Sequence, residues 1–282
     1  MHFNGEIIRS RQNKNVVELC RLNDRKAREA ARLFRFDGIK LLEEAVKKGL
    51  EVTAVFVCAS QVEKIEAELT KRCGKAVFDS FDRTLVIADE IFERISEEKS
   101  PEGVISIAKY IDKFQKNVTI YNSADFFAKE NERIVLLESV RDPSNIGAII
   151  RSAAAMGIDR LIVSSDCADI YHPRAVRASM GTLFDQRIDR VADLPAAIEV
   201  LKQNGRRVFA AALDESAMVL GRFEMQNGDC VVIGNEGHGL SDATCAACSH
   251  SVIIPMSGRA ESFNAAVAAA VLMWEFSGRC KS

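Results

Sequence analysis

Hydrophobic and polar residues fall into a first series of alternating helices and strands. Apolar residues at helical spacing predict helices over residues 15–35, 39–49, 61–72 and 88–95. Short runs rich in β-branched residues predict strands over residues 52–57, 76–78 and 103–108. Strands separated by helical patterns indicate a small α/β unit at the N-terminal end.

A second, more regular series follows a mixed and charged stretch over residues 110–132. Strands are predicted over residues 134–137, 161–164, 184–188, 208–213, 231–233 and 252–254. Helices are predicted over residues 146–156, 173–180, 194–204, 242–248 and 265–274. Runs such as Val231-Val232-Ile233 lack the alternation of a half-exposed sheet, which favours a parallel sheet covered on both faces.

The length of 282 residues suggests two domains, on a prior of roughly 100–200 residues per domain. We place the first domain at residues 1–115, a linker at 116–132 and the second domain at 133–282. The hydrophobic fraction of 48% and the charged fraction of 28% are typical of a soluble globular protein. Neither an apolar signal-peptide core nor a membrane-spanning stretch is visible, so we expect a cytoplasmic protein without a membrane partner.

Charge and cysteine content give weaker indications. The net charge of −2 makes no general case for nucleic acid, although residues 1–40 hold ten Lys or Arg against five Asp or Glu. This basic end could meet phosphates or could be a solvated helix face. Eight cysteines in a chain without a leader indicate reduced thiols. Cys245-Ala-Ala-Cys248 lacks a second ligand pair at recognisable spacing, so no metal is predicted.

The most informative stretch is a strand, loop and helix near the C-terminal end. Val252 to Ile254 reads as a buried strand stopped by Pro255, and a small polar loop follows over residues 256–261. Ser262 stands where the N-cap of the next helix is expected. That helix is alanine-rich and apolar on every side, which indicates burial. Four polar side chains lie at the mouth of this helix: Arg259, Glu261, Ser262 and Asn264.

Ligands of open α/β sheets bind beyond the carboxyl ends of the strands, and three such loops stand out. They cover residues 138–151, 234–241 and 256–264. The glycines of the second loop have the spacing of neither a dinucleotide fingerprint nor a Walker loop, but they indicate a tight bend or a close approach to a ligand. No Ser-His-Asp arrangement can be assembled from the scattered histidines.

Taken together, these loops make the chain similar to a known family. Three segments resemble the three motifs of the TrmH (SpoU) branch of the SPOUT RNA methyltransferases. They are Asn145-Ile-Gly147-Ala-Ile-Ile-Arg151, Ile233-Gly234-Asn235-Glu236-Gly237-His-Gly239-Leu-Ser241, and Ile254-Pro255-Met256 with Ser262-Phe263-Asn264. The resemblance covers roughly residues 133–277. Residues 32–38 and 102–105 resemble the substrate-binding domain that often precedes it, with Asp37 where Glu is usual.

The resemblance implies an α/β fold whose C-terminal SPOUT domain has a parallel sheet and a deep trefoil knot, after a smaller N-terminal α/β substrate-binding domain. It implies a homodimer that transfers a methyl group from S-adenosylmethionine (AdoMet) to a ribose 2′-hydroxyl of rRNA or tRNA. The implied cofactor-binding residues are Leu213, Gly234, Ile254, Met256 and Phe263. The implied catalytic residues are Asn145, Arg151, Glu236, Ser262 and Asn264.

The chemistry of these side chains agrees with such roles. A guanidinium stays protonated, so Arg151 is a poor base but can bind an RNA phosphate or stabilise a developing alkoxide. Asn145, Ser262 and Asn264 can donate hydrogen bonds, and Glu236 can orient a neighbouring group. Two other classes stay open: an RNA-binding protein of this fold without catalysis, and a nucleotide-dependent oxidoreductase. The sequence does not reveal which RNA or nucleotide is the substrate.

Overall fold

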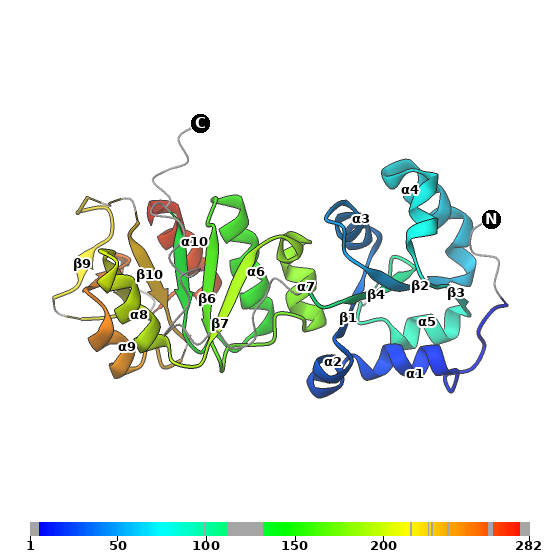
Figure 1. The fold of residues 1–282 in the computed structure, drawn as a ribbon, viewed down its shortest axis with the longest axis horizontal. Helices are drawn as coiled ribbons and strands as arrows, with labels where there is room; N and C mark the ends of the chain where they lie inside the picture. Colours follow the sequence, from blue (N-terminus) through cyan, green and yellow to red (C-terminus); the bar gives the residue numbers. More distant parts are fainter. Residues whose placement is uncertain are drawn as a thin grey trace. The chain divides into compact units, whose positions relative to one another are not determined.

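The computed structural model describes residues 6–98, 100–111, 132–214, 216–224, 226, 228–235, 237–258 and 262–276. The chain forms two compact units. Residues up to Ile111 and the segment Asp169–Asp185 make up the first unit, and the rest of the described chain makes up the second (Figure 1). The predicted linker at 116–132 lies, apart from Glu132, outside the described residues, so the predicted domain limits stay a prediction.

The first unit is built on a four-stranded sheet in the order β1-β4-β2-β3. Its strands are β1 (Leu33–Asp37), β2 (Val52–Cys58), β3 (Thr84–Ile87) and β4 (Val104–Lys109). β4 runs antiparallel to β1 and β2, whereas β2 and β3 are parallel. The helices are α1 (Lys14–Arg21), α2 (Arg25–Ala31), α3 (Ile39–Lys47), α4 (Val62–Cys73), α5 (Asp89–Ile95) and α7 (Pro173–Ser179). Short 3₁₀ helices cover Ala59–Gln61, Lys75–Ser80 and Thr182–Phe184.

The single helix predicted over residues 15–35 is wrong, because this stretch holds α1, α2 and the strand β1. The side chain of Asp24 caps α2 by accepting a hydrogen bond from the backbone of Ala27, which starts a new helix. Arg32 ends that helix in the left-handed region, at φ 57°. The buried Arg35 hid the strand from pattern analysis, since its charge is satisfied by Asp37 and by the Ile95 carbonyl oxygen.

Two further predicted strands are misplaced. Residues 76–78 lie in the 3₁₀ helix Lys75–Ser80, and the strand that pairs with β2 is β3, six residues further along the chain. Phe184 likewise ends a 3₁₀ helix, and the strand starts only at Arg187. In both cases buried aromatic residues in a turn look like strand residues in the sequence, because burial and strand propensity favour the same residue types.

The segment Asp169–Asp185 is fastened to the first unit by a buried ion pair. Arg28 is 1% exposed, and its Nη2 lies 2.6 Å from Oδ2 of Asp169. Nη1 of Arg28 donates to the carbonyl oxygens of Leu22 and Asn23. Nearby, the rings of Tyr110 and Tyr171 stack with their centroids 3.9 Å apart. The segment is therefore part of the core of this unit although it lies far away in the sequence.

We expect Asp169→Ala to lower the free energy of unfolding by about 3–5 kcal/mol, because it leaves the buried Arg28 guanidinium without its counter-charge. Urea unfolding followed by circular dichroism measures this change. Glu29→Ala is the matched control: it breaks the half-exposed pair of Glu29 with Arg25, which is worth about 0–1 kcal/mol. Equal losses in the two variants would contradict the assignment of Asp169 to the core.

The second unit contains a seven-stranded sheet in the order β7-β6-β5-β10-β8-β11-β9. The strands are β5 (Ile134–Leu137), β6 (Arg160–Ser164), β7 (Arg187–Val191), β8 (Val208–Ala211), β9 (Met218–Val219), β10 (Cys230–Ile233) and β11 (His250–Ile253). All of its strand pairs are parallel. The predicted α/β fold with a parallel sheet is confirmed.

Among the described residues, the helices that cover this sheet are α6 (Pro143–Ala155), α8 (Leu194–Gln203), α9 (Asp242–Ala247) and α10 (Ala265–Phe276). α8 and α9 pack against one face through a cluster that includes Leu136, Ile198 and Val232. α6 and α10 pack against each other, and α10 contacts β10 (Figure 1). Both faces are thus covered, as the continuous apolar strands require.

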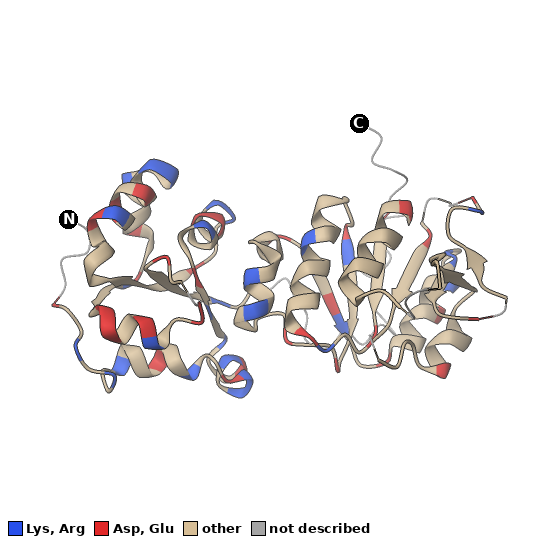
Figure 2. Ribbon diagram, turned by 180° about the vertical axis from the view of Figure 1, so that it is seen from behind, with Lys and Arg blue, Asp and Glu red and all other residues tan. Residues whose placement is uncertain are grey.

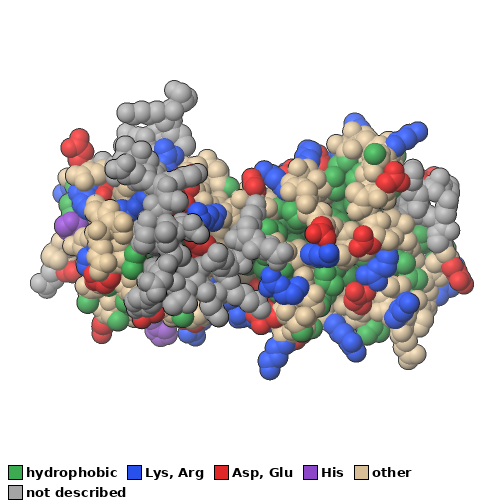
Figure 3. Space-filling view, in the orientation of Figure 1, with side chains coloured by type: hydrophobic (Ala, Val, Ile, Leu, Met, Phe, Trp, Pro, Cys, Tyr) green, Lys and Arg blue, Asp and Glu red, His purple; other side chains and the backbone are tan. Residues whose placement is uncertain are grey.

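Charged residues of both signs are interspersed on the helices of the first unit (Figure 2). The space-filling view shows the same mixture, with apolar side chains visible between the charges (Figure 3). In these views, the excess of Lys and Arg in residues 1–40 does not form a uniformly basic face. None of the described helices has the length and hydrophobicity that crossing a membrane requires.

Candidate functional site

The predicted site residues follow four neighbouring strands. Asn145 comes after β5, Gly234 after β10, Leu213 after β8, and Ile254 after β11. These strands lie side by side in the order β5-β10-β8-β11, and they are parallel. Their carboxyl ends therefore meet at one edge of the sheet, where ligands of open α/β sheets bind. The topology gathers residues that are separated by more than 100 positions.

Residues 234–241, which we call the glycine loop, fold back on themselves at Gly234. The backbone N–H of Asn235 donates to the Gly239 carbonyl oxygen (3.0 Å), and the Gly239 N–H donates to that of Asn235 (2.9 Å). A Cβ atom on Gly234 would lie 2.4 Å from the backbone carbon of Gly239. Position 234 therefore excludes any side chain, which explains the glycine. Glu236 lies outside the described residues, and its predicted role stays a prediction.

Asn264 connects the final loop to the first motif. Its Nδ2 donates to Oδ1 of Asn145 at 3.1 Å. Its Oδ1 accepts from the backbone N–H groups of Ala266 (3.0 Å) and Val267 (3.4 Å). Asn264 is therefore the N-cap of α10, and the expectation that Ser262 caps this helix is wrong. Ser262 lies two residues before the cap and is exposed.

The remaining predicted residues lie on the surface of the second unit. Arg151 is exposed on α6, two turns after the helix start. Two predicted cofactor-binding residues are exposed although they are apolar: Leu213 at 75% and Phe263 at 41%. Met256 is half-buried in the loop after β11. Large exposed apolar side chains on loops that follow neighbouring strands are the kind of surface that a flat, partly apolar ligand covers.

Pattern analysis missed a polar network beside this edge. Ser139 follows β5 with φ 54°, and its N–H donates to Oγ of Ser164 (2.9 Å). The hydroxyl groups of Ser139 and Ser164 both donate to the carboxylate of Asp166 (2.5 and 2.6 Å). Burial raises the pKa of Asp166, but the hydrogen bonds from Ser139 and Ser164 contribute to a net lowering of this pKa below its usual value. A Ser-Ser-Asp set spread over the loop after β5, the end of β6 and the loop after β6 carries no sequence motif, so only strand pairing reveals it.

Two thiols of the second unit are in a poor state for binding a metal. Burial raises the pKa of Cys248 to about 12 and that of Cys230 to about 11, so both stay protonated at neutral pH. Zinc binds the thiolate form. Among the described residues, no group of three or more His, Cys, Asp or Glu side chains could hold a metal ion.

Family comparisons agree with this geometry. Residues 132–274 match the SpoU rRNA Methylase family, and residues 13–106 match the MRM3-like substrate binding domain. The chain therefore belongs to the SpoU rRNA methylase family, and the predicted family is confirmed.

Individual relatives cover almost the whole chain. A Bacillus subtilis protein named 23S rRNA (guanosine(2553)-2'-O)-methyltransferase RlmP is 26% identical over 96% of this chain and 99% of the relative. The 23S rRNA (uridine(2479)-2'-O)-methyltransferase of Streptomyces viridochromogenes is 30% identical over 90% of this chain and 85% of its own. The crystal structure of an AdoMet-bound rRNA methyltransferase from Sinorhizobium meliloti superposes with a TM-score of 0.78, at 26% identity, over 98% of this chain and 99% of that one.

Proposed function

We propose that the protein transfers a methyl group from AdoMet to a ribose 2′-hydroxyl of ribosomal RNA. The observation that supports this most strongly is the convergence of the three family motifs at the carboxyl ends of the parallel strands β5, β10 and β11. Family membership and the full-length relatives named as rRNA 2′-O-methyltransferases support the reaction class. AdoMet is the cofactor, as in the related structure from Sinorhizobium meliloti.

The glycine loop and the loop after β11 provide a fitting cradle for AdoMet. Gly234 lets two backbone segments touch, and the exposed Leu213 and Phe263 offer apolar cover. Ile254 and Met256 complete the proposed cofactor-binding set. Bound AdoMet would supply a methyl group on a positively charged sulfonium, whose charge disappears on transfer. The protein then has to orient the acceptor hydroxyl and help it lose a proton.

We assign that task to residues of α6 and the final loop. Arg151 stays protonated, so it holds an RNA phosphate or stabilises the oxygen as its negative charge develops. The Asn145–Asn264 hydrogen bond fixes the first motif against the start of α10. Ser262, which is exposed two residues before Asn264, would donate a hydrogen bond to the ribose. Glu236 would orient these groups.

Mapping of 2′-O-methylated positions in total RNA, with and without the gene, tests the proposal and identifies the nucleotide. We expect one rRNA position to lose its methyl group when the gene is deleted and to regain it on complementation. An RNA-binding protein without catalysis would leave the map unchanged. The family match removes the ground for an oxidoreductase. The trefoil knot and the cytoplasmic location stay predictions.

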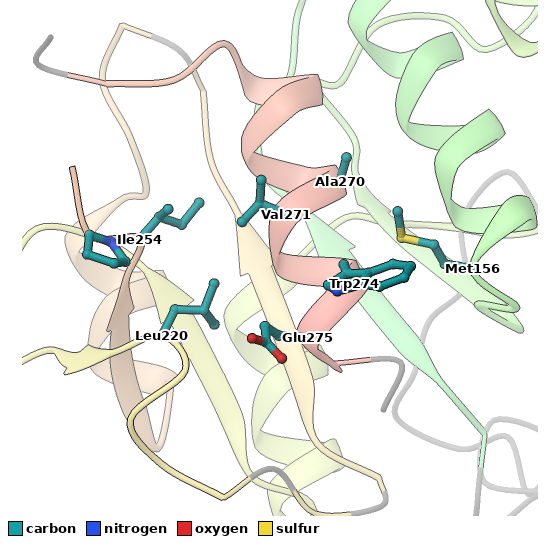
Figure 4. A pocket seen from close by; sticks show the side chains of 8 residues that line it. Met156, Leu220, Ile254, Ala270, Val271, Trp274 and Glu275 are labelled. Atoms are coloured by element: carbon teal, nitrogen blue, oxygen red, sulfur yellow. The ribbon is translucent and has the colours of Figure 1, made fainter. Parts of the chain in front are cut away.

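We propose that the enzyme is a homodimer that pairs through α10. This helix has one charged residue among its twelve, Glu275, and exposes Val267 and Trp274 at 48% and 50%. Beside it lies a groove of about 470 Å³. In Figure 4, Val271 points toward Ile254 and Leu220, and Trp274 extends toward Met156. An exposed apolar surface beside a groove suits a second copy related by two-fold symmetry.

Trp274→Glu should convert the dimer into a monomer, because it replaces the largest exposed apolar side chain of α10 with a charged one. Sedimentation velocity at micromolar concentrations gives the mass. Lys71→Glu changes the charge of an exposed residue on α4 and should leave the dimer intact. A parent protein that sediments as a monomer, or a Trp274→Glu variant that remains dimeric, would contradict the proposed interface.

A further inference from the structure

A buried carboxylate holds the end of the glycine loop that leads into α9. Glu138 directly follows β5 and is 9% exposed. Its Oε2 accepts a hydrogen bond from the backbone N–H of Ser241 (2.8 Å). Its Oε1 accepts from the hydroxyl groups of Ser241 (2.8 Å) and Thr244 (2.6 Å). Three donors from the loop and the first turns of α9 therefore converge on one side chain of another strand.

The other end of the glycine loop is attached to Glu138 and to the next residue, Ser139. The backbone N–H of Glu138 donates to the carbonyl oxygen of Ile233 at 2.9 Å, just before the loop begins. Nδ2 of Asn235 then donates to the carbonyl oxygen of Ser139 at 2.8 Å. Ser139 is itself held by the network with Ser164 and Asp166. Both ends of the loop thus depend on one rigid dipeptide, Glu138-Ser139.

We propose that Glu138 is a positioning residue for the methyl donor, acting through the glycine loop. This inference rests on the proposed function, because the loop is assigned to AdoMet there. A carboxylate is an acceptor at every lone pair, so it satisfies the three donors at once. A glutamine keeps only one acceptor oxygen, so either the backbone N–H of Ser241 or the two hydroxyl groups would face its NH₂ group, and the loop would shift. Glu138 itself is buried, so it would act on AdoMet only through the loop that it holds.

The test compares Glu138→Gln with the parent by calorimetric titration of AdoMet and by steady-state methylation of rRNA. We expect AdoMet affinity to fall about tenfold, since an unsatisfied buried donor costs about that factor. KM for AdoMet should rise in parallel, whereas KM for RNA and kcat at saturating AdoMet should change less than threefold by the same reasoning. Thr244→Val should add little further loss in the Glu138→Gln background, because the two residues act through one contact.

Asp229→Asn is the matched control at the opposite end of β10. Asp229 is also a buried carboxylate with three donors: Nε and Nη2 of Arg207, and the backbone N–H of Gln226. Its loss should lower stability and leave AdoMet affinity unchanged. Equal weakening of AdoMet binding in both variants, or parent-like binding by Glu138→Gln, would overturn the proposal.

A single substitution at Thr244 covers the case in which Glu138→Gln does not fold. Thr244→Val removes one of the three donors and keeps the shape of the side chain, so AdoMet affinity should fall about threefold. Unchanged affinity in this variant would overturn the proposal as well. A parent protein that binds AdoMet but methylates no RNA would contradict the proposed function and leave the role of Glu138 standing.

Discussion

Arg151→Ala should reduce methyl transfer by about 10²–10³-fold, the usual loss when a donor aimed at developing negative charge is removed. The side chain is exposed on α6, so its removal leaves no cavity and the melting temperature should stay within a few degrees of the parent. AdoMet affinity should also be unchanged, because Arg151 is assigned to the RNA and the acceptor oxygen. Transfer of labelled methyl groups to rRNA measures the effect under single-turnover conditions.

Arg133→Ala provides the control for Arg151. Arg133 is an exposed arginine of the same unit, next to the amino end of β5 and therefore at the other edge of the sheet. Both substitutions remove one positive charge, so a general electrostatic effect on RNA binding would appear in both. Parent-like turnover by Arg151→Ala, or equal losses in the two variants, would show that the role of Arg151 is assigned wrongly.

Gly234→Ala should abolish measurable AdoMet binding. The added Cβ would lie 2.4 Å from the backbone carbon and 2.5 Å from the oxygen of Gly239, and a backbone segment cannot rotate away as a side chain can. The glycine loop would have to open. A displacement of about 1 Å in a positioned group already lowers a reaction rate about 100-fold, and an opened loop would no longer hold AdoMet. We also expect a stability loss of about 1–3 kcal/mol from overpacking. Calorimetry with AdoMet and thermal unfolding measure the two effects.

Gly237→Ala is the matched control in the same loop. A Cβ there meets Oδ1 of Asn235 at 3.4 Å, which is an ordinary contact, and the backbone of Gly237 has no positive φ. AdoMet affinity should therefore remain close to that of the parent. If Gly234→Ala binds AdoMet as well as Gly237→Ala does, the crossing at Gly234 does not shape the cofactor site.

The sequence predicts the strands of the second unit well because they are continuous apolar runs. β10 and β11, for example, are short β-branched segments bounded by Gly234 and by Pro255. It fails at β1, where the buried Arg35 interrupts the apolar pattern, and at the two-residue β9, which is too short to show any period. Each of these strands forms by pairing with a distant segment: β1 pairs with β4, and β9 pairs with β11.

Sequence patterns also miss the contacts that site residues make with distant parts of the chain. The motifs identify Asn145 and Asn264, but only the folded chain shows that their side chains meet and that Asn264, not Ser262, caps α10. Glu138 carries no motif signal of its own; it becomes informative once β10 is known to lie beside β5. Strand order depends on pairings between distant segments, which local patterns do not encode.

The most direct test of the account is transfer of a labelled methyl group from AdoMet to unmodified rRNA by the purified protein. We predict incorporation at a single position that becomes resistant to alkaline cleavage, as a 2′-O-methylated ribose does. The label should depend on AdoMet and disappear in Arg151→Ala. Binding of AdoMet without incorporation into any RNA, or incorporation into a base instead of a ribose, would contradict the account.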